Sequence, residues 1–272
     1  MARALASAGH EVVATSQASQ RSMDRILASF PPIEVTEPAG VLEASDLVLV
    51  TVPDDVLPGL IAGMAATDAP YAGRLVVHAS GRYGTAVLDP ATRQGALPLA
   101  LHPVMTFTGR DDDLQRMKDV SFGVTAPEQL RPVAEALVIE MGGEPVIIAE
   151  ERRALYHAAL ASAANHLVTL VAESADLLGQ AGVQDPARML APLLSASLDN
   201  ALRFGDAGLT GPVARGDAGT VARHIQALNE ASPAAKTAYV ALARLTAERA
   251  LAAGRLKPED AERLLDVLGG QA

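Results

Sequence analysis

The chain of 272 residues has room for one large domain or two ordinary ones, and its 49% hydrophobic and 20% charged content excludes a disordered protein. A net charge of -10 with no basic cluster argues against nucleic acid and anionic membrane surfaces as partners. The absence of cysteine from the sequence excludes a thiol nucleophile, a disulfide framework and a thiolate metal site.

The chain begins with the pattern of the second half of a helix. Ala4, Leu5 and Ala8 have helical spacing, Gly9 suits the helix end, and an apolar run starts at Val12. In dinucleotide-binding folds this pattern follows a central first strand and a G-x-G-x-x-G loop, neither of which precedes it here. Four buried aliphatics of such a strand are worth about 6–12 kcal/mol, against about 5–15 kcal/mol for a whole domain. We therefore expect that the true product starts upstream, or that this product is unstable and binds dinucleotide poorly.

Up to about residue 149, short β-type runs alternate with helical segments. The predicted strands are Glu11–Thr15, Ile33–Val35, Leu47–Val52, Leu75–His78, Leu99–Leu101, Ser121–Thr125 and Pro145–Ile148. The helical segments between them include Ala18–Ser29, Val56–Ala66 and Glu128–Met141. This alternation predicts βαβ units and a mostly parallel sheet, and thus an α/β domain over residues 1–149.

From residue 150 onwards the β signal disappears. The predicted helices are Arg152–Ala181, Pro186–Phe204, Ala218–Leu228, Pro233–Ala253 and Pro258–Leu268. Asp185 and Ser232 each precede a proline, as N-caps do. The apolar stretch 158–178 contains Asn165 and Glu173 among other polar residues, so it predicts a buried helix of a soluble protein and not a membrane span. We expect an all-helical domain over residues 150–272 in a cytoplasmic protein.

The predicted strand Glu11–Thr15 ends in hydroxyl residues, at the position where an acidic residue would bind the ribose of NAD. Thr15 and Ser16 stand there, and Arg21 follows in the next helix. Hydroxyls and a guanidinium suit a 2'-phosphate, so NADP is favoured over NAD. Alternatively, these are only solvated residues at the start of a helix.

Two further strand ends offer cofactor contacts at the same sheet edge. Val52, Pro53 and Asp54 follow a buried strand, where open α/β folds bind ligands, and Ser80 and Gly81 follow the next strand. The alternatives are structural: Pro53 begins a helix that Asp54 caps, and Ser80 caps a turn.

Candidate catalytic residues lie on a strand end and on the first long helix. His102 is held before a proline and is suited to acid–base chemistry or to substrate binding. At 100° per residue, His157 and Asn165 lie within one helical stripe that a ligand could approach closely. His102 could instead bond loop backbone, and the stripe could instead pack against another helix.

A constrained loop between helices, LTGPVARGD, carries Thr210 and Arg215, and Arg215 is suited to bind a carboxylate or phosphate. Asp217 suits the capping of the next helix. The six histidines show neither paired-ligand spacing nor a surrounding carboxylate cluster, so we expect no metal site.

Several motifs occur together in one order: AGHEVV, VPDDVL, HASG, LHPVMTF, ALYHAALASAANHLV, LDNAL and LTGPVARGD. Together they resemble the Rossmann-like family with a C-terminal domain of unknown function 2520, a relative of pyrroline-5-carboxylate reductase and ketopantoate reductase. The resemblance implies an N-terminally truncated Rossmann-like NADP domain, a helical substrate and dimerisation domain, and a homodimer. By position in such relatives, His157 and Asn165 are the residues expected to meet the nicotinamide.

The sequence therefore favours an NADP-dependent oxidoreductase acting on a small carbonyl, imine or hydroxyacid. The residues expected to hold the substrate are His102, His157, Asn165, Thr210 and Arg215. One alternative is a non-catalytic dinucleotide sensor or assembly module, since no clear proton donor is evident. The other is a truncated product that binds no cofactor.

Overall fold

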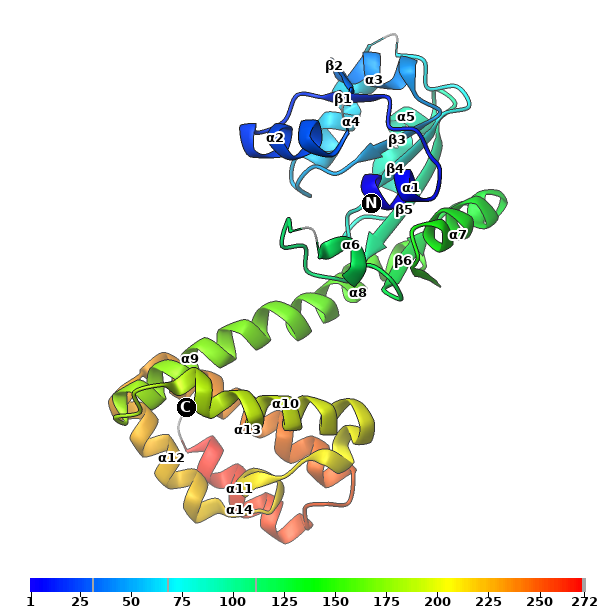
Figure 1. The fold of residues 1–272 in the computed structure, drawn as a ribbon. Coiled ribbons are helices and arrows are strands. Elements are labelled where there is room, and N and C mark those ends of the chain that lie inside the picture. The colour runs from blue at the N-terminus through cyan, green and yellow to red at the C-terminus, as the bar shows by residue number, and fades with distance from the viewer. Residues whose placement is uncertain (31, 68, 111, 271–272) are drawn as a thin grey trace. The chain divides into compact units, whose positions relative to one another are not determined.

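The computed structural model describes residues 1–30, 32–67, 69–110 and 112–270, and it divides into two compact units, Met1–Ala164 and Asn165–Ala272 (Figure 1). The first is an α/β unit and the second is helical, as the sequence predicted. Their boundary lies later than the predicted one at residues 149/150, because the helix that follows β7 packs its first residues into the first unit.

The first unit holds two sheets. β1 (Ala14–Ser16) and β2 (Glu34–Thr36) pair in parallel. The second sheet has the order β3 (Leu47–Val50), β4 (Leu75–His78), β5 (Leu97–Pro103), β6 (Ser121–Thr125), β7 (Glu144–Ile147). Its pairs are parallel except β5 with β6. The sequence predicted a single sheet, but the structure has two. They are separate because no described strand lies between β1 and β3 and pairs with both.

Helices cover both faces of the larger sheet. The helices α1 (Ala2–Ser7), α6 (Asp113–Arg116) and α7 (Arg131–Glu140) contribute to one core, and α3 (Pro38–Ala44), α4 (Leu57–Ala65) and α5 (Asp89–Thr92) contribute to the other. The unit also contains α2 (Gln20–Ser29) and α8 (Arg153–Ala161). Consecutive side chains of β4 enter opposite cores: Val76 packs with Leu42 and Ile61, and Val77 packs with Phe122 and Val138. This two-sided burial is the physical reason why the strands of this sheet are continuously apolar.

Local capping explains where several elements begin. The helix predicted over Ala18–Ser29 is α2, which starts at Gln20 because the Ser19 hydroxyl accepts the backbone N–H of Ser22. Gly9 has φ +104° just after α1, a conformation that glycine adopts without strain, and it ends the helix as predicted.

The second unit contains α9 (Leu167–Gln180), α10 (Pro186–Phe204), α11 (Gly211–Ala214), α12 (Ala218–Ala231), α13 (Pro233–Ala252) and α14 (Pro258–Gly269). The predicted N-caps are confirmed: Asp185, Asp217 and Ser232 each accept a backbone N–H of the following turn. Val221, Ile225 and Leu264 form part of the core between α11 and α14.

The prediction that the stretch 158–178 is buried is wrong. α9 has no buried residue, and Val168 is 69% exposed. Several apolar side chains of α9 and α10 are exposed in this single chain, although Leu190 of α10 is buried. One described helix, Glu150–Gln180, is long and apolar enough to cross a membrane by length and composition alone, a test that helices of soluble proteins also pass.

A π-helical turn, Ser162–His166, interrupts this long helix between α8 and α9. The uniform 100° spacing used to place His157 and Asn165 on one stripe therefore does not apply here. Their common stripe stays a prediction.

Candidate active site

The carboxyl ends of β4 and β5 bring three predicted site residues together. A Cβ built on Gly81 would lie 2.8 Å from His102 Nε2 and 2.8 Å from His157 Cδ2. The two imidazole rings meet edge to face with their centroids 6.1 Å apart. Only a glycine leaves room for both rings at this strand end, so the motif HASG has a steric reason. His102, Gly81 and His157 form what we call the histidine site.

Tyr156 completes this site, although the sequence did not single it out. Its hydroxyl lies 2.8 Å from His102 Nδ1, and a Cβ on Gly123 would lie 2.4 Å from the phenolic oxygen. Burial raises the pKa of Tyr156, whereas the charge of Arg153 and a hydrogen bond from the Gly123 backbone lower it, with a net increase. Tyr156 is therefore a neutral phenol at pH 7.

His102 is a neutral imidazole for similar reasons. Burial lowers its pKa from 6.5 to about 4, and the charge of Arg153 and the neighbouring His157 act in the same direction. The carboxylate of Asp54 acts in the opposite direction and is outweighed. At pH 7 this ring carries one N–H and one lone pair, so it can donate and accept a hydrogen bond at once.

Arg153 is 1% exposed and lies beneath the histidine site. Its guanidinium donates to the Thr125 hydroxyl and to three backbone carbonyl oxygens, those of Ser80, Ala100 and Gly123. None of these partners is a carboxylate. Arg153 also stands 5.7 Å from the centroid of the Tyr156 ring. A buried positive charge held only by neutral oxygens keeps a positive potential at this sheet edge.

The turn after β4 is fixed by His78 and Ser80. The Ser80 backbone N–H donates to His78 Nδ1 at 3.2 Å, so the Nε2–H of the same ring donates to the Gly84 carbonyl at 2.8 Å. The Ser80 hydroxyl accepts the backbone N–H groups of Arg82 and Tyr83. The structural role left open for Ser80 is thus present, and its contact with a cofactor stays a prediction.

Pro53 and Asp54, which follow β3, do not have the helix-start and helix-cap roles that were their structural alternative. α4 begins at Leu57 without a side-chain cap, so Pro53 does not start that helix and Asp54 does not cap it. The Pro53 carbonyl instead accepts the N–H groups of Val56 and Leu57. Asp54 is half-buried, and its charge raises the proton affinity of His78 and His102, which places it at the same edge. Val52 is half-buried beside it.

A hollow of about 470 Å³ opens at the start of α2, directly after β1 with Thr15 and Ser16. Its lining residues are Ser19, Arg21, Ser22, Arg25, Phe107, Thr108, Gly109 and Asp113. We call it the α2 hollow. Among the described residues, neither Arg21 nor Arg25 forms an ion pair with a carboxylate.

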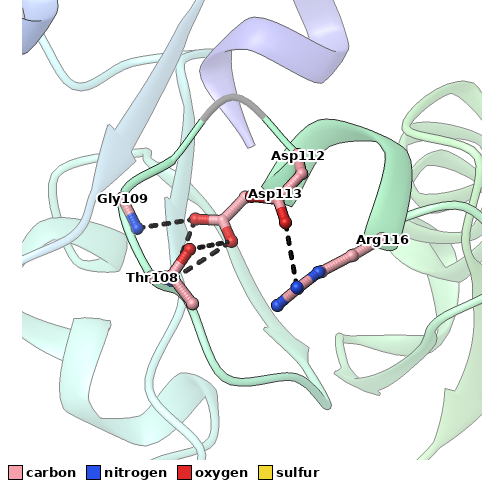
Figure 2. Close-up of polar contacts among 5 residues, drawn as sticks. All are labelled: Thr108, Gly109, Asp112, Asp113 and Arg116. Atoms are coloured by element: carbon pink, nitrogen blue, oxygen red, sulfur yellow. Dashed lines mark hydrogen bonds and ion pairs between the residues drawn. The ribbon is translucent and has the colours of Figure 1, made fainter.

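The opposite wall of the α2 hollow is a loop tied to α6 (Figure 2). The Asp113 carboxylate accepts the backbone N–H groups of Thr108 and Gly109 and the Thr108 hydroxyl, at 2.7–3.2 Å. Burial raises the pKa of Asp113, but these hydrogen bonds outweigh it and leave the pKa below its ordinary value. The anion of Asp113 is therefore satisfied by the loop, and the two arginines across the hollow are left without a carboxylate among the described residues.

The remaining predicted residues belong to the second unit. Asn165 lies in the π-helical turn, and Thr210 and Arg215 flank α11; all three are exposed. Gly211 and Gly216 have φ +91° and +74°, which confirms a constrained loop. The contacts of these three side chains with a substrate stay predictions. Within the described part of the chain, no group of three or more His, Asp or Glu is placed to hold a metal ion.

Sequence models of two domains match the chain. A Rossmann-like domain matches residues 1–103, and the domain of unknown function 2520 matches residues 120–246. The chain therefore carries a Rossmann-like domain followed by the domain of unknown function 2520. Between them the matches span both units, so the resemblance expected from the motifs is confirmed.

Solved structures show the same fold. Protein TM1727 from Thermotoga maritima is 21% identical with a TM-score of 0.69, over 92% of this chain and 95% of that one. BF3122 from Bacteroides fragilis, a candidate NADP oxidoreductase, is 21% identical with a TM-score of 0.72, over 91% and 92%. A reductive aminase from Aspergillus terreus, in complex with NADPH and ethyl levulinate, is 17% identical with a TM-score of 0.64, over 98% and 95%. No curated protein matches the sequence.

Proposed function

We propose that this protein is an NADP-dependent oxidoreductase that transfers a hydride to or from a small carbonyl, imine or hydroxyacid. The observation that carries the proposal is the α2 hollow, directly after β1, where two arginines stand with two serine hydroxyls and pair with no carboxylate of the described residues. In a Rossmann-like domain this is the position of the adenosine ribose. The name of the relative from Bacteroides fragilis and the NADPH in the Aspergillus terreus structure point to the same cofactor.

The chemistry of the α2 hollow fits a 2'-phosphate. Arg25 reaches the opposite wall, where its Nη1 lies 2.6 Å from a Cβ built on Gly109, and its Nη2 donates to the Ser22 hydroxyl at 3.3 Å. Guanidinium and hydroxyl donors bind phosphate oxygens by charge-assisted hydrogen bonds. Arg21, Ser19 and Ser22 would share the phosphate with Arg25, and Thr15 and Ser16 would contact the ribose.

The histidine site is the proposed place of reaction. NADP, when bound, supplies or removes the hydride, so the chain itself needs groups that hold the substrate and exchange a proton. His102 and His157 present half-buried imidazoles at the carboxyl ends of the strands, where such folds bind ligands. Asp54, Val52, Pro53, Ser80 and Gly81 would line the cofactor side of the same edge. Substrate binding by Asn165, Thr210 and Arg215 stays a prediction from the sequence.

We also propose that the protein is a soluble homodimer, in which α9 and α10 of each chain pack against the second chain. Leu193, Leu198 and Leu202 of α10 are 52–79% exposed, as is Val168 of α9. Exposed apolar patches of this kind mark interfaces between chains. A second copy of the same helices would bury them.

The test is a fluorescence titration with NADPH and NADH. We expect tighter binding of NADPH, and we expect Arg21→Ala and Arg25→Ala each to raise its dissociation constant about 10- to 150-fold, because a hydrogen bond to a charged group is worth about 1.5–3 kcal/mol. NADH binding should change less than threefold. Arg131→Ala, which removes an exposed arginine outside the α2 hollow, is the matched control.

Absence of NADPH binding at millimolar concentration would refute the proposal. Binding without turnover on a panel of carbonyls, imines and hydroxyacids would instead identify a dinucleotide sensor. Equal losses of NADPH and NADH affinity in the two arginine variants would remove the assignment of the 2'-phosphate to the α2 hollow.

A further inference from the structure

We infer that Tyr156 supplies a proton through His102 to the oxygen of a carbonyl substrate. The inference rests on the proposed reductase function and assigns a role to two residues, Tyr156 and Arg153, that this function does not otherwise use. It is carried by the contact of the phenol with His102 Nδ1 and by the buried guanidinium beneath both rings.

The hydrogen bonds favour the tautomer of His102 that carries its proton on Nε2. The Gly123 backbone donates to the phenolic oxygen of Tyr156, so the phenol hydrogen is free to point at His102 Nδ1 at 2.8 Å. A neutral imidazole that accepts at Nδ1 carries its hydrogen on Nε2. That nitrogen is the one nearest Gly81, so the N–H is presented to the histidine site.

A neutral His102 cannot act alone as the acid. Its pKa of about 4 means that the imidazolium is scarce at pH 7, and the neutral ring can give up its Nε2–H only if Nδ1 gains a proton at the same time. Tyr156 is placed to provide that proton. The ring then works as a relay, and the phenol works as the proton store.

Arg153 makes the relay electrostatically feasible. When Tyr156 loses its proton, the negative phenolate lies beside a guanidinium that has only neutral hydrogen-bond partners. Of the charged groups acting on His102, Arg153 is the strongest, and the carboxylate of Asp54 opposes it weakly. Glu150 acts on His78 and Arg153, but its carboxylate is bonded to the N–H groups of Thr85 and Ala86.

The same positive potential selects the substrate class. It disfavours a protonated imine, which brings a positive charge to the site, and favours a neutral carbonyl whose oxygen becomes negative. A hydride adds to the carbonyl carbon, the oxygen takes the His102 Nε2 hydrogen, and His102 Nδ1 takes the phenol hydrogen of Tyr156. Solvent then returns one proton to the phenolate, so a carbonyl, a hydride and a proton give an alcohol.

The experiment is Tyr156→Phe, which keeps the ring and removes only the hydroxyl. The matched control is Tyr239→Phe in the second unit, because the Tyr239 hydroxyl also bonds a histidine Nδ1, that of His224, at 3.0 Å and edge to face. We expect Tyr156→Phe to lower the rate of carbonyl reduction about 100- to 10,000-fold, the usual contribution of general acid catalysis. The dissociation constant of NADPH and the rate with preformed iminium ions should change less than threefold, and the control should change neither.

A second readout does not need turnover. Nitrogen-15 NMR of His102 in the wild type should show a protonated Nε2 and an unprotonated Nδ1 at pH 7, and its titration midpoint should rise in Arg153→Lys less than in Arg153→Met. A protonated Nδ1 would overturn the relay. So would a carbonyl rate within twofold of wild type in Tyr156→Phe, or equal losses for carbonyl and iminium substrates. Failure of the proposed function appears differently, as wild-type protein that binds no NADPH.

Discussion

His78 gives the sharpest stability prediction, because its ring is locked in the neutral form. The Ser80 N–H donates to Nδ1, so a proton on that nitrogen would break the bond and leave a charge in a core residue that is 1% exposed. Burial lowers the pKa of His78 from 6.5 to about 4, the charge of Arg153 acts in the same direction, and Gly84, Asp54 and Glu150 oppose it. We predict that in His78→Gln the free energy of unfolding of the first unit decreases less between pH 7.5 and 4.5 than in the wild type.

The sign and size follow from proton linkage. The unfolded chain protonates His78 near pH 6.5 and the folded chain only near pH 4, so between these values the unfolded state binds more protons and stability falls as the pH falls. The full difference is about 3 kcal/mol at 1.36 kcal/mol per pH unit, of which about 2.5 kcal/mol is lost between pH 7.5 and 4.5. Above pH 6.5 this contribution is fully present.

At pH 7.5 the His78→Gln variant should be less stable than the wild type. His78→Gln weakens the bonds to Ser80 and Gly84, which we expect to cost about 1–3 kcal/mol at pH 7.5. It then lacks the His78 titration, so its stability curve should converge with that of the wild type near pH 4.5. Carboxylates that titrate in the same interval are common to both proteins and leave the difference unchanged.

Hydrogen exchange of the β4 and β5 amides, in increasing urea from pH 4.5 to 7.5 and corrected for intrinsic rates, measures this difference for the first unit alone. His224→Gln in the second unit controls for the loss of a histidine as such. Parallel curves for His78→Gln and wild type would refute the reasoning, because they would mean that His78 titrates alike in the folded and unfolded states.

Two further predictions concern the buried arginine and the exposed helices. Arg153→Lys should destabilise the first unit by about 3 kcal/mol or more, since one ammonium cannot serve four acceptors on two strands and a turn. Hydrogen exchange of β5 and β6 measures this loss, and a loss below about 1 kcal/mol would contradict the bridging role of the Arg153 guanidinium. Leu202→Glu on α10, where Leu202 is 79% exposed, should convert the proposed dimer to monomer in sedimentation at micromolar concentration. The matched charge at Gln226→Glu on α12 should leave the dimer intact, and a dimer that survives Leu202→Glu would move the interface elsewhere.

The sequence determined the elements where one local rule dominated. The strands Leu75–His78 and Ser121–Thr125 match their predicted bounds, because both faces of each strand are buried. The caps Asp185, Asp217 and Ser232 were equally predictable, since a short polar side chain before a helical pattern satisfies an otherwise free N–H.

The candidate site was only half predictable. His102, Gly81 and His157 were identified from their places at strand ends and on the first long helix, because parallel strands end at one edge of a sheet. Arg153 and Tyr156 were missed, although Arg153, Tyr156 and His157 lie three and four residues apart on one helical face. That spacing was the available signal. The spacing does not reveal that Arg153 is buried, because its burial depends on strands that are distant in the sequence.

The sequence by itself thus determined an α/β unit followed by helices, the strand ends that carry polar residues, and the basic start of α2. Only the tertiary structure decided that two sheets form, that the apolar face of α9 is exposed in one chain, and that a buried guanidinium lies beneath Tyr156 and His102. Periodicity and capping are local, so they can be inferred from neighbouring residues. Strand pairing, exposure and the electrostatic environment of a histidine arise from contacts between residues that are distant in the sequence, which no local pattern encodes. The contact of Arg153 with Ser80, 73 residues away, is an example.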